Sequence, residues 1–301
     1  MENRPPPSPF KEGCLKGKVA LLTGGGSGIG YEISLQLGKH GASLAIMGRR
    51  DHVLRSAVDA LSHHSISAIG IEGDVRKEDD ALRAVESTFK HYGRLDILVN
   101  AAAGNFLVAS DHLSPNGFLT VIDIDAVGTF TMCRKALKYL QKGGPGKDPS
   151  SDGIIINISA TLHYTASWYQ VHVSAAKAAV DSITRSLALE WGTDYGIRVN
   201  GIAPGPISDT AGASKLGPGE LMEEMQQMPL FKLGDKWDVA MAGVYLASDA
   251  GKFINGTTLV VDGGQWLSSP RRLPKDAVTQ LSREAERRSR DSPVGLPRTK
   301  L

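Results

Sequence analysis

The sequence contains little cysteine, little net charge and no long apolar run, and each shortage excludes a class of protein. Two cysteines, Cys14 and Cys133, among 301 residues exclude a disulfide framework and fit a reducing compartment. No apolar run approaches the roughly 18 residues that a membrane-spanning helix needs. The prolines between Pro5 and Pro9 interrupt any apolar leader helix, so we expect no secretory signal.

The charge is nearly balanced, at +2 for the whole chain, but it is unevenly distributed. Residues 268–301 contain nine basic and four acidic residues, a surplus of +5, so the preceding 267 residues carry −3. A body with net negative charge gives no reason to expect a nucleic-acid partner. We interpret the basic end as a solvated tail.

Seven short β-type runs alternate with helical patterns, which is typical of parallel strands joined by right-handed crossovers. The expected strands are 18–22, 42–47, 66–71, 95–100, 154–159, 198–203 and 257–261, and the expected helices are 29–39, 56–62, 78–91, about 118–140, 174–191 and 235–246. We therefore predict an α/β fold, a single doubly wound Rossmann domain with a mostly parallel seven-stranded sheet and helices on both faces. This domain is expected over residues 15–267, between a flexible Pro-rich arm (1–14) and a Pro/Arg-rich tail (268–301).

A glycine-rich turn, Thr23–Gly30, follows the first strand and leads into the first helical pattern. This order favours a dinucleotide site, because glycines let the backbone approach a pyrophosphate and a helix N-terminus attracts its negative charge. An ordinary tight loop is the alternative for this stretch taken alone. The candidate cofactor ligands are Gly24, Gly26, Ser27, Gly28, Ile29 and Gly30.

The end of the second strand distinguishes NADP from NAD. NAD sites usually place an acidic residue there, about 20 residues past the glycines, on the ribose hydroxyl. This chain instead has Arg49 and Arg50, and guanidinium groups bind a 2′-phosphate bidentately. The predicted cofactor is therefore NADPH/NADP+, with two solvent-facing arginines as the alternative interpretation. Asp74 and Val75 follow the third strand, where they can hold an adenine edge.

At these motifs the chain resembles the short-chain dehydrogenase/reductase family, over about residues 16–266. The matching segments are Thr23–Gly30, Asp74–Val75, Asp96–Asn100, Ile154–Ser159, Ser174–Lys177, Arg198–Asn200, Ala203–Ile207 and Val261–Gly264. The resemblance implies that Asn100, Lys177, Pro204, Gly205 and Ile207 also belong to the cofactor site.

The chain departs from the family at three of its four catalytic positions. The family uses Asn, Ser, Tyr and Lys, and of these only Lys177 is present. Asp125 stands at the Asn position, Ala160 at the Ser position and Val173 at the Tyr position. Since valine cannot deliver a proton, ordinary carbonyl reduction is not expected. Two interpretations follow: a catalytically silent NADP-binding protein, or an active reductase with altered chemistry.

These departures resemble the 2,4-dienoyl-CoA reductases, above all their peroxisomal branch. The segments Asn100–Phe106, Asp123–Asp125 and Ser174–Lys177 carry this resemblance. It implies an oxidoreductase of β-oxidation that uses NADPH to reduce a 2,4-dienoyl-CoA to a 3-enoyl-CoA. Hydride addition to the far end of the diene moves negative charge onto the thioester oxygen, which requires oxyanion donors and an acid. Another short-chain reductase, acting on an enoyl thioester or a carbonyl, is the alternative enzyme.

The resemblance assigns catalytic roles to Asp125 and Lys177. Asp125 would deliver a proton through a water, or else only position a water, and Lys177 would bind the nicotinamide ribose. Tyr164, Tyr169 and His172 are near enough in sequence to be rival proton donors.

The sequence also predicts residues that bind the acyl-CoA substrate and a location in the cell. By resemblance, Arg49, Arg76 and Lys215 serve the CoA phosphates, and Phe106, Ser114 and Asn116 follow the fourth strand on the ligand-binding face. Residues 208–232 correspond to a substrate lid in relatives. The terminal Thr299-Lys300-Leu301 resembles the peroxisomal Ser-Lys-Leu address, so we expect the import receptor as a partner and the peroxisome as the location. We also expect a homo-oligomer and no metal site.

Overall fold

The computed structural model describes residues 7–210, 225, 228–268, 278, 283–284 and 287. The chain divides into two compact units, residues 1–266 and 267–301, and the fold described below is that of the first. Within the described residues, no helix combines the length and the apolar character that a membrane span requires.

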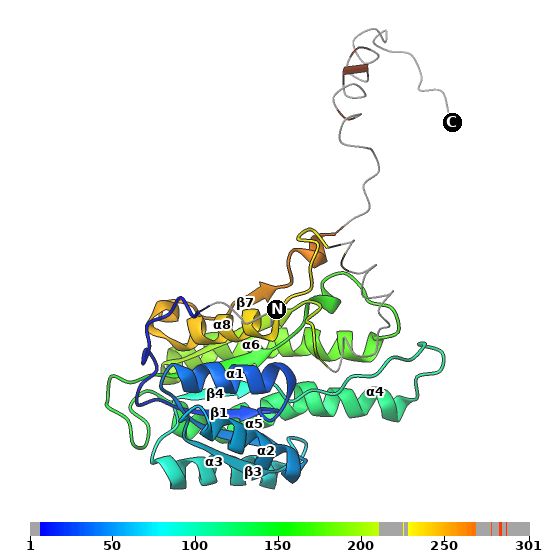
Figure 1. Ribbon diagram of the computed structural model, residues 1–301. Coiled ribbons are helices and arrows are strands. Elements are labelled where there is room, and N and C mark those ends of the chain that lie inside the picture. The colour runs from blue at the N-terminus through cyan, green and yellow to red at the C-terminus, as the bar shows by residue number, and fades with distance from the viewer. Residues whose placement is uncertain are drawn as a thin grey trace. The chain divides into compact units, whose positions relative to one another are not determined.

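Seven parallel strands form one sheet in the order β3-β2-β1-β4-β5-β6-β7. Figure 1 labels β1, β3, β4 and β7 of this sheet. The strands are β1 (Val19–Thr23), β2 (Ser43–Gly48), β3 (Ala68–Glu72), β4 (Ile97–Asn100), β5 (Gly153–Ile158), β6 (Ile197–Pro204) and β7 (Thr258–Val261). The strand order reverses between β1 and β4, and such a switch point opens a crevice at the carboxyl ends of the strands. The predicted doubly wound sheet is confirmed.

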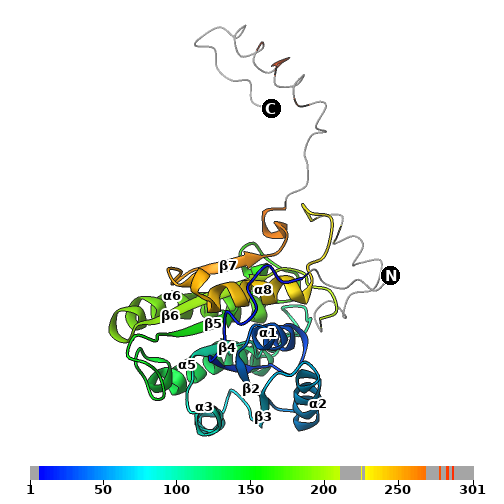
Figure 2. The ribbon, with the colours of Figure 1, turned by 60° about the vertical axis from the view of Figure 1, so that its left-hand side comes forward.

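Helices cover both faces of this sheet, as Figure 2 shows. They are α1 (Gly28–Lys39), α2 (Asp51–Ser62), α3 (Glu78–Tyr92), α4 (Pro115–Ile122), α5 (Gly128–Leu140), α6 (Val171–Tyr195) and α8 (Lys236–Ala247). Strand alternation sorts the apolar side chains between two cores: Leu22 packs with α1, α2 and α8, whereas Leu21 packs on the opposite face with α3, α5 and α6.

The single helix predicted over 118–140 is wrong in one respect, because a π-helical turn interrupts it. The helix α4 ends at Ile122, the π turn spans Asp123–Val127, and α5 begins at Gly128. A π turn adds one residue to the helical path and therefore changes which side chain faces inward. Here it buries the side chain of Asp125.

Residues 8–14 lie against the domain, whereas the composition predicted a loose arm over 1–14. The Ser8 hydroxyl is 2.7 Å from His40 Nε2, and the Phe10 ring stands edge-on to the same imidazole at 6.1 Å. Phe10 and Cys14 also pack against the core that contains α1. An apolar contact of this kind is set by the position of α1, which the composition of the segment does not show.

Candidate active site

A cavity of about 530 Å³ lies where the strand order reverses, at the carboxyl ends of β1, β4, β5 and β6. Its walls come from the glycine-rich turn, the segment after β4, the π turn, the end of β5 and α6. The lining residues that the sequence predicted are Gly24, Gly26, Ser27, Gly28, Ile29, Gly30, Arg49, Arg50, Asp74, Val75, Asp125, Lys177, Pro204 and Gly205. The structure therefore brings most of the candidate residues to one cavity.

The glycine-rich turn fits a phosphate-bearing ligand. Gly24 has a positive φ of +66°, and a Cβ there would lie 2.7 Å from the Ala101 carbonyl oxygen, so the turn packs tightly against the segment after β4. Gly28 also has a positive φ, +57°, but a Cβ there would meet nothing within 4 Å. Ser27, the N-cap of α1, makes no side-chain capping bond. The first N–H groups of α1 can therefore face a pyrophosphate across open space.

The charged end of the cavity contains Arg49 and Arg50, both exposed at its rim. Asp74 lies beside them, and Arg76 Nε is 3.0 Å from each of its carboxylate oxygens. This hydrogen bonding by Arg76 holds the pKa of Asp74 below its usual range, since it favours the ionised carboxylate. The end is thus rich in fixed charge, as a nucleotide phosphate site requires.

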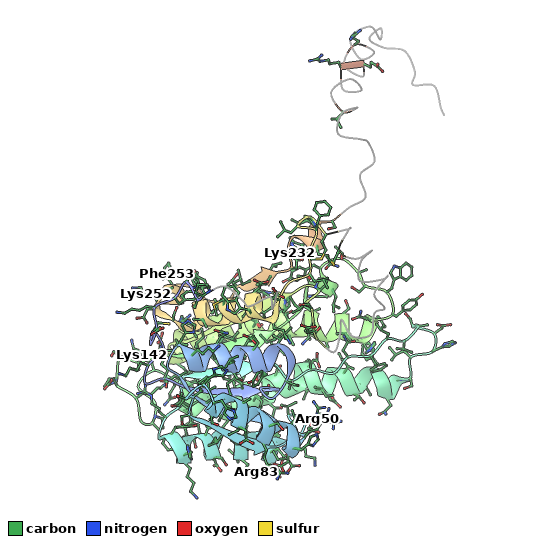
Figure 3. All side chains as sticks on the ribbon, in the orientation of Figure 1. Arg50, Arg83, Lys142, Lys232, Lys252 and Phe253 are labelled. Carbon is green, nitrogen blue, oxygen red and sulfur yellow. The ribbon has the colours of Figure 1, made fainter. Side chains whose placement is uncertain are left out.

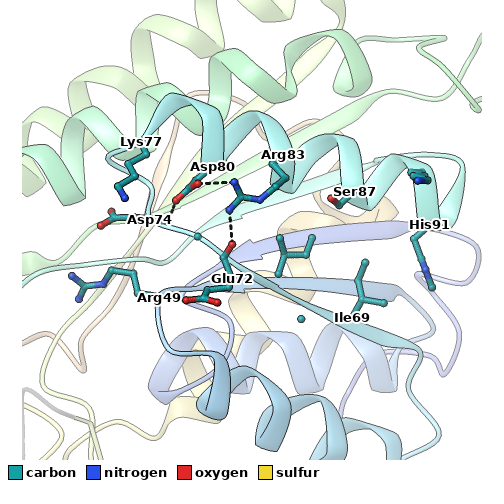
Figure 4. A pocket seen from close by; sticks show the side chains of 13 residues that line it. Arg49, Ile69, Glu72, Asp74, Lys77, Asp80, Arg83, Ser87 and His91 are labelled. Carbon is teal, nitrogen blue, oxygen red and sulfur yellow. Dashed lines mark hydrogen bonds and ion pairs between the residues drawn. The ribbon is translucent and has the colours of Figure 1, made fainter.

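A second, larger hollow of about 890 Å³ adjoins this charged end, between β3 and α3 (Figure 4). It shares Arg49, Gly73 and Asp74 with the cavity. Within it, Arg83 donates to the Asp80 carboxylate at 2.7 Å and to the Glu72 carbonyl oxygen at 2.9 Å. Arg83 therefore binds the carbonyl of Glu72, the last residue of the edge strand β3.

Asp125 and Lys177 form a buried ion pair at the other end of the cavity. Lys177 Nζ lies 3.0 Å from one Asp125 carboxylate oxygen and donates to the Ile158 carbonyl at 2.9 Å. The Gly104 N–H donates to the second carboxylate oxygen at 2.7 Å. Asp125 is 1% exposed and Lys177 6% exposed, so the two charges neutralise each other away from bulk water. The sequence predicted both residues but not their direct contact.

The three rival proton donors do not line this cavity. Burial and the neighbouring Asp181 carboxylate raise the pKa of Tyr164 to about 12, and its ring packs edge-on against Trp266. Tyr169 is exposed on a loop, and His172 is buried with its ring 4.3 Å from that of Phe106. Asp125 and Lys177, by contrast, line the cavity together with Ala160 and Val173.

Some predicted cofactor and substrate residues lie elsewhere. Asn100 faces the core, where its amide donates to Asn157 at 2.9 Å, and Ile207 is buried in the core with α8. Ser114 caps α4 by accepting the Gly117 N–H at 3.0 Å. Arg76, Asn116 and Phe106 lie outside the cavity lining, and Lys215 and the terminal tripeptide lie outside the described residues.

Several residues that shape the site were missed by the sequence analysis. The cavity is also lined by Ala101, Ala102, Ala103, Ser159, Leu162 and Thr210, among others. His163 comes directly after Leu162 in the chain. Its Nε2 is 3.0 Å from the Asp181 carboxylate, and its Nδ1 is 2.8 Å from the Ala160 carbonyl oxygen. This pair ties the Ala160 segment to α6. A lone histidine in the sequence gives no signal for such a contact.

The parallel sheet, the glycine-rich turn and the switch-point cavity define a Rossmann-type oxidoreductase that uses a nicotinamide cofactor. A family model described as enoyl-(acyl carrier protein) reductase matches residues 24–265. A crystal structure of a short chain dehydrogenase from Bacillus anthracis has 38% sequence identity and a TM-score of 0.75, covering 86% of this chain and all of that one. The chain belongs to the short-chain dehydrogenase/reductase family.

Two curated relatives narrow the comparison further. The peroxisomal 2,4-dienoyl-CoA reductase [(3E)-enoyl-CoA-producing] of Arabidopsis thaliana is 69% identical over 296 residues, which cover 98% of this chain and 99% of that protein. The protein of the same name from Danio rerio is 43% identical, over 86% of this chain and 85% of its own length. The similarity to the first thus extends over almost the whole of both chains.

Proposed function

We propose that this protein reduces a 2,4-dienoyl-CoA to a 3-enoyl-CoA with NADPH, in the β-oxidation of unsaturated fatty acids. The buried Asp125–Lys177 pair carries the proposal, because it lies in a cofactor-type cavity whose usual Ser and Tyr are replaced by Ala160 and Val173. The identity to peroxisomal 2,4-dienoyl-CoA reductases supports the same reaction. An intact cavity with a paired acid and base argues against a silent binding protein.

The residues divide the chemistry between them. A bound nicotinamide would supply the hydride for the δ-carbon of the substrate, which leaves negative charge on the thioester oxygen until a proton adds at the α-carbon. Lys177 would contribute positive potential and hold the ribose. The ionised Asp125 would take a proton from the neighbouring Lys177 ammonium and pass it through a water to the α-carbon, and solvent would reprotonate Lys177. The Gly104 N–H fixes the carboxylate that performs this step.

Substrate comparison tests the reaction. Purified protein is expected to oxidise NADPH with a 2,4-dienoyl-CoA and to show little oxidation with a simple ketone or a 2-enoyl-CoA, since Val173 provides no proton donor to a carbonyl oxygen. NADPH absorbance and the mass of the product report the result. Faster turnover of the ketone would assign the protein to another class of short-chain reductase.

Cofactor choice is tested at Arg49. Because Arg49 and Arg50 stand at the cavity rim, NADPH should bind more tightly than NADH, and Arg49→Asp should narrow or reverse that preference. Titration of both cofactors measures it. The exposed Arg55→Asp, on the outer turn of α2, is a matched control. Equal affinity of the parent protein for the two cofactors would contradict the NADP assignment.

We propose a peroxisomal location, supported by the terminal Thr299-Lys300-Leu301 and by the peroxisomal relatives. A fluorescent protein carrying residues 268–301 at its free C-terminus should enter peroxisomes. Removal of the last three residues from the full chain should leave it in the cytosol. A cytosolic signal from the intact tail would rule out the import receptor as its partner.

We further propose a homo-oligomer and a CoA site that includes Arg49 and Arg76. The oligomer is supported by large apolar side chains that are exposed on α5 and α6, Phe130 and Leu189. Arg49 lines the charged end of the cavity, and Arg76, outside the lining, is bonded to the Asp74 carboxylate that lines it, so both would supply cations for the CoA phosphates.

A further inference from the structure

Five large apolar side chains are exposed on two segments next to the cavity, the loop after β4 and the loop before α6 with the first residue of α6. They are Phe106, Leu107, Trp168, Tyr169 and Val171, named here the apolar strip, and their exposed fractions range from 36% to 85%. Single exposed apolar residues are common on protein surfaces, but a contiguous group usually marks a binding site. The apolar strip therefore needs an occupant.

The two loops are fixed to each other and to the cavity wall. The Val108 N–H donates to the Tyr169 carbonyl oxygen at 3.1 Å, which joins the loop after β4 to the loop before α6. The Ser167 hydroxyl donates to the Leu162 carbonyl oxygen at 3.2 Å. Tyr169 itself has a φ of +61°, a left-handed conformation that costs energy for a residue with a side chain and is often found at ligand-binding segments.

The apolar strip continues the cavity. Asn105 and Val173 line the cavity, and their chain neighbours Phe106 and His172 contact each other, with ring centroids 4.3 Å apart. Phe106 therefore joins the strip to the edge of the cavity. The cavity thus has fixed charges at its nucleotide end and an apolar exit at the other.

We infer that the apolar strip binds the part of the acyl chain beyond the reacting diene, so that this protein favours long-chain 2,4-dienoyl thioesters. The inference rests on the proposed function. A six-carbon dienoyl chain ends shortly after its diene and leaves the strip uncovered, whereas a long chain covers it. Each methylene that becomes buried is expected to improve binding on the order of fourfold.

A double variant, Trp168→Ser with Tyr169→Asn, tests this inference, because asparagine tolerates the left-handed backbone of position 169. We expect kcat/KM for a 2,4-octadecadienoyl-CoA to fall at least tenfold, mainly through KM, and kcat/KM for 2,4-hexadienoyl-CoA to change less than about twofold. Phe253→Ser is the matched control, since Phe253 (labelled in Figure 3) is 97% exposed and precedes β7, at the opposite end of the parallel strands.

Binding of saturated thioesters separates this inference from the proposed function. Palmitoyl-CoA and butanoyl-CoA lack the diene, and calorimetry below the micellar concentration measures their affinities. The parent protein should bind palmitoyl-CoA at least tenfold more tightly, and the double variant should lose that difference. If binding depends on chain length but no dienoyl-CoA is turned over, the inference that the apolar strip binds the acyl chain is supported and the proposed reaction is overturned.

Other occupants give different results. An unchanged chain-length preference in the double variant overturns the inference. If sedimentation then shows dissociation of an oligomer, the strip is an interface between copies of this chain. If binding to phosphatidylcholine vesicles is lost instead, the strip contacts lipid.

Discussion

Asp125→Asn is expected to lower turnover of a 2,4-dienoyl-CoA by about 10²–10⁴-fold, the usual contribution of a positioned acid. Asparagine has nearly the same shape and keeps an oxygen for the Gly104 N–H, which lies 2.7 Å from the carboxylate. It cannot pass on a proton as a carboxyl group can. NADPH affinity should change much less than turnover, because the proposed role of Asp125 is proton delivery.

Single-turnover measurement with bound NADPH checks this result without interference from product release. Asp123→Asn is a matched control, since Asp123 belongs to the same π turn but is exposed. A loss of less than about tenfold would show that Asp125 only positions a water. Unchanged turnover would refute the catalytic role of Asp125, and the proton donor would then be sought among Tyr164, Tyr169 and His172.

The fold was predictable because its signals are local. Each strand is a short apolar run bounded by glycine or polar residues, and parallel pairing follows from the alternation with helices. The glycine-rich turn and the two arginines are also local motifs whose ligand can be predicted from their residue types. These motifs therefore predict the cofactor end of the cavity from the sequence alone.

The catalytic end was less predictable because it depends on tertiary contacts. A π turn differs from a continuous helix by one residue, and periodicity does not resolve that difference. Asn100 illustrates the same limit in a strand: it lies two residues after Leu98, so strand alternation directs both side chains into the core with α5. The motif predicted that Asn100 binds the cofactor, but its position in the strand turns its side chain toward the core.

Lys177→Met is the second change with a large expected effect. It leaves the Asp125 carboxylate, 1% exposed, without its cation. Loss of one partner of a buried ion pair typically costs about 3–5 kcal/mol, and for a domain of this size that lowers Tm by roughly 6–20 °C. NADPH affinity and turnover should both fall, because Lys177 has been assigned to the ribose as well as to the thioester charge. Lys252→Met, at an exposed position labelled in Figure 3, should change none of the three.

The double variant Lys177→Met with Asp125→Asn distinguishes a charge effect from a packing effect. Removing both charges eliminates the unpaired carboxylate, so the double variant should be more stable than Lys177→Met alone while turnover stays low. Thermal unfolding of the parent protein, the two single variants and the double variant measures the coupling free energy between the two residues. If the double variant were no more stable than Lys177→Met, the 3.0 Å contact would contribute to stability through packing and not through charge.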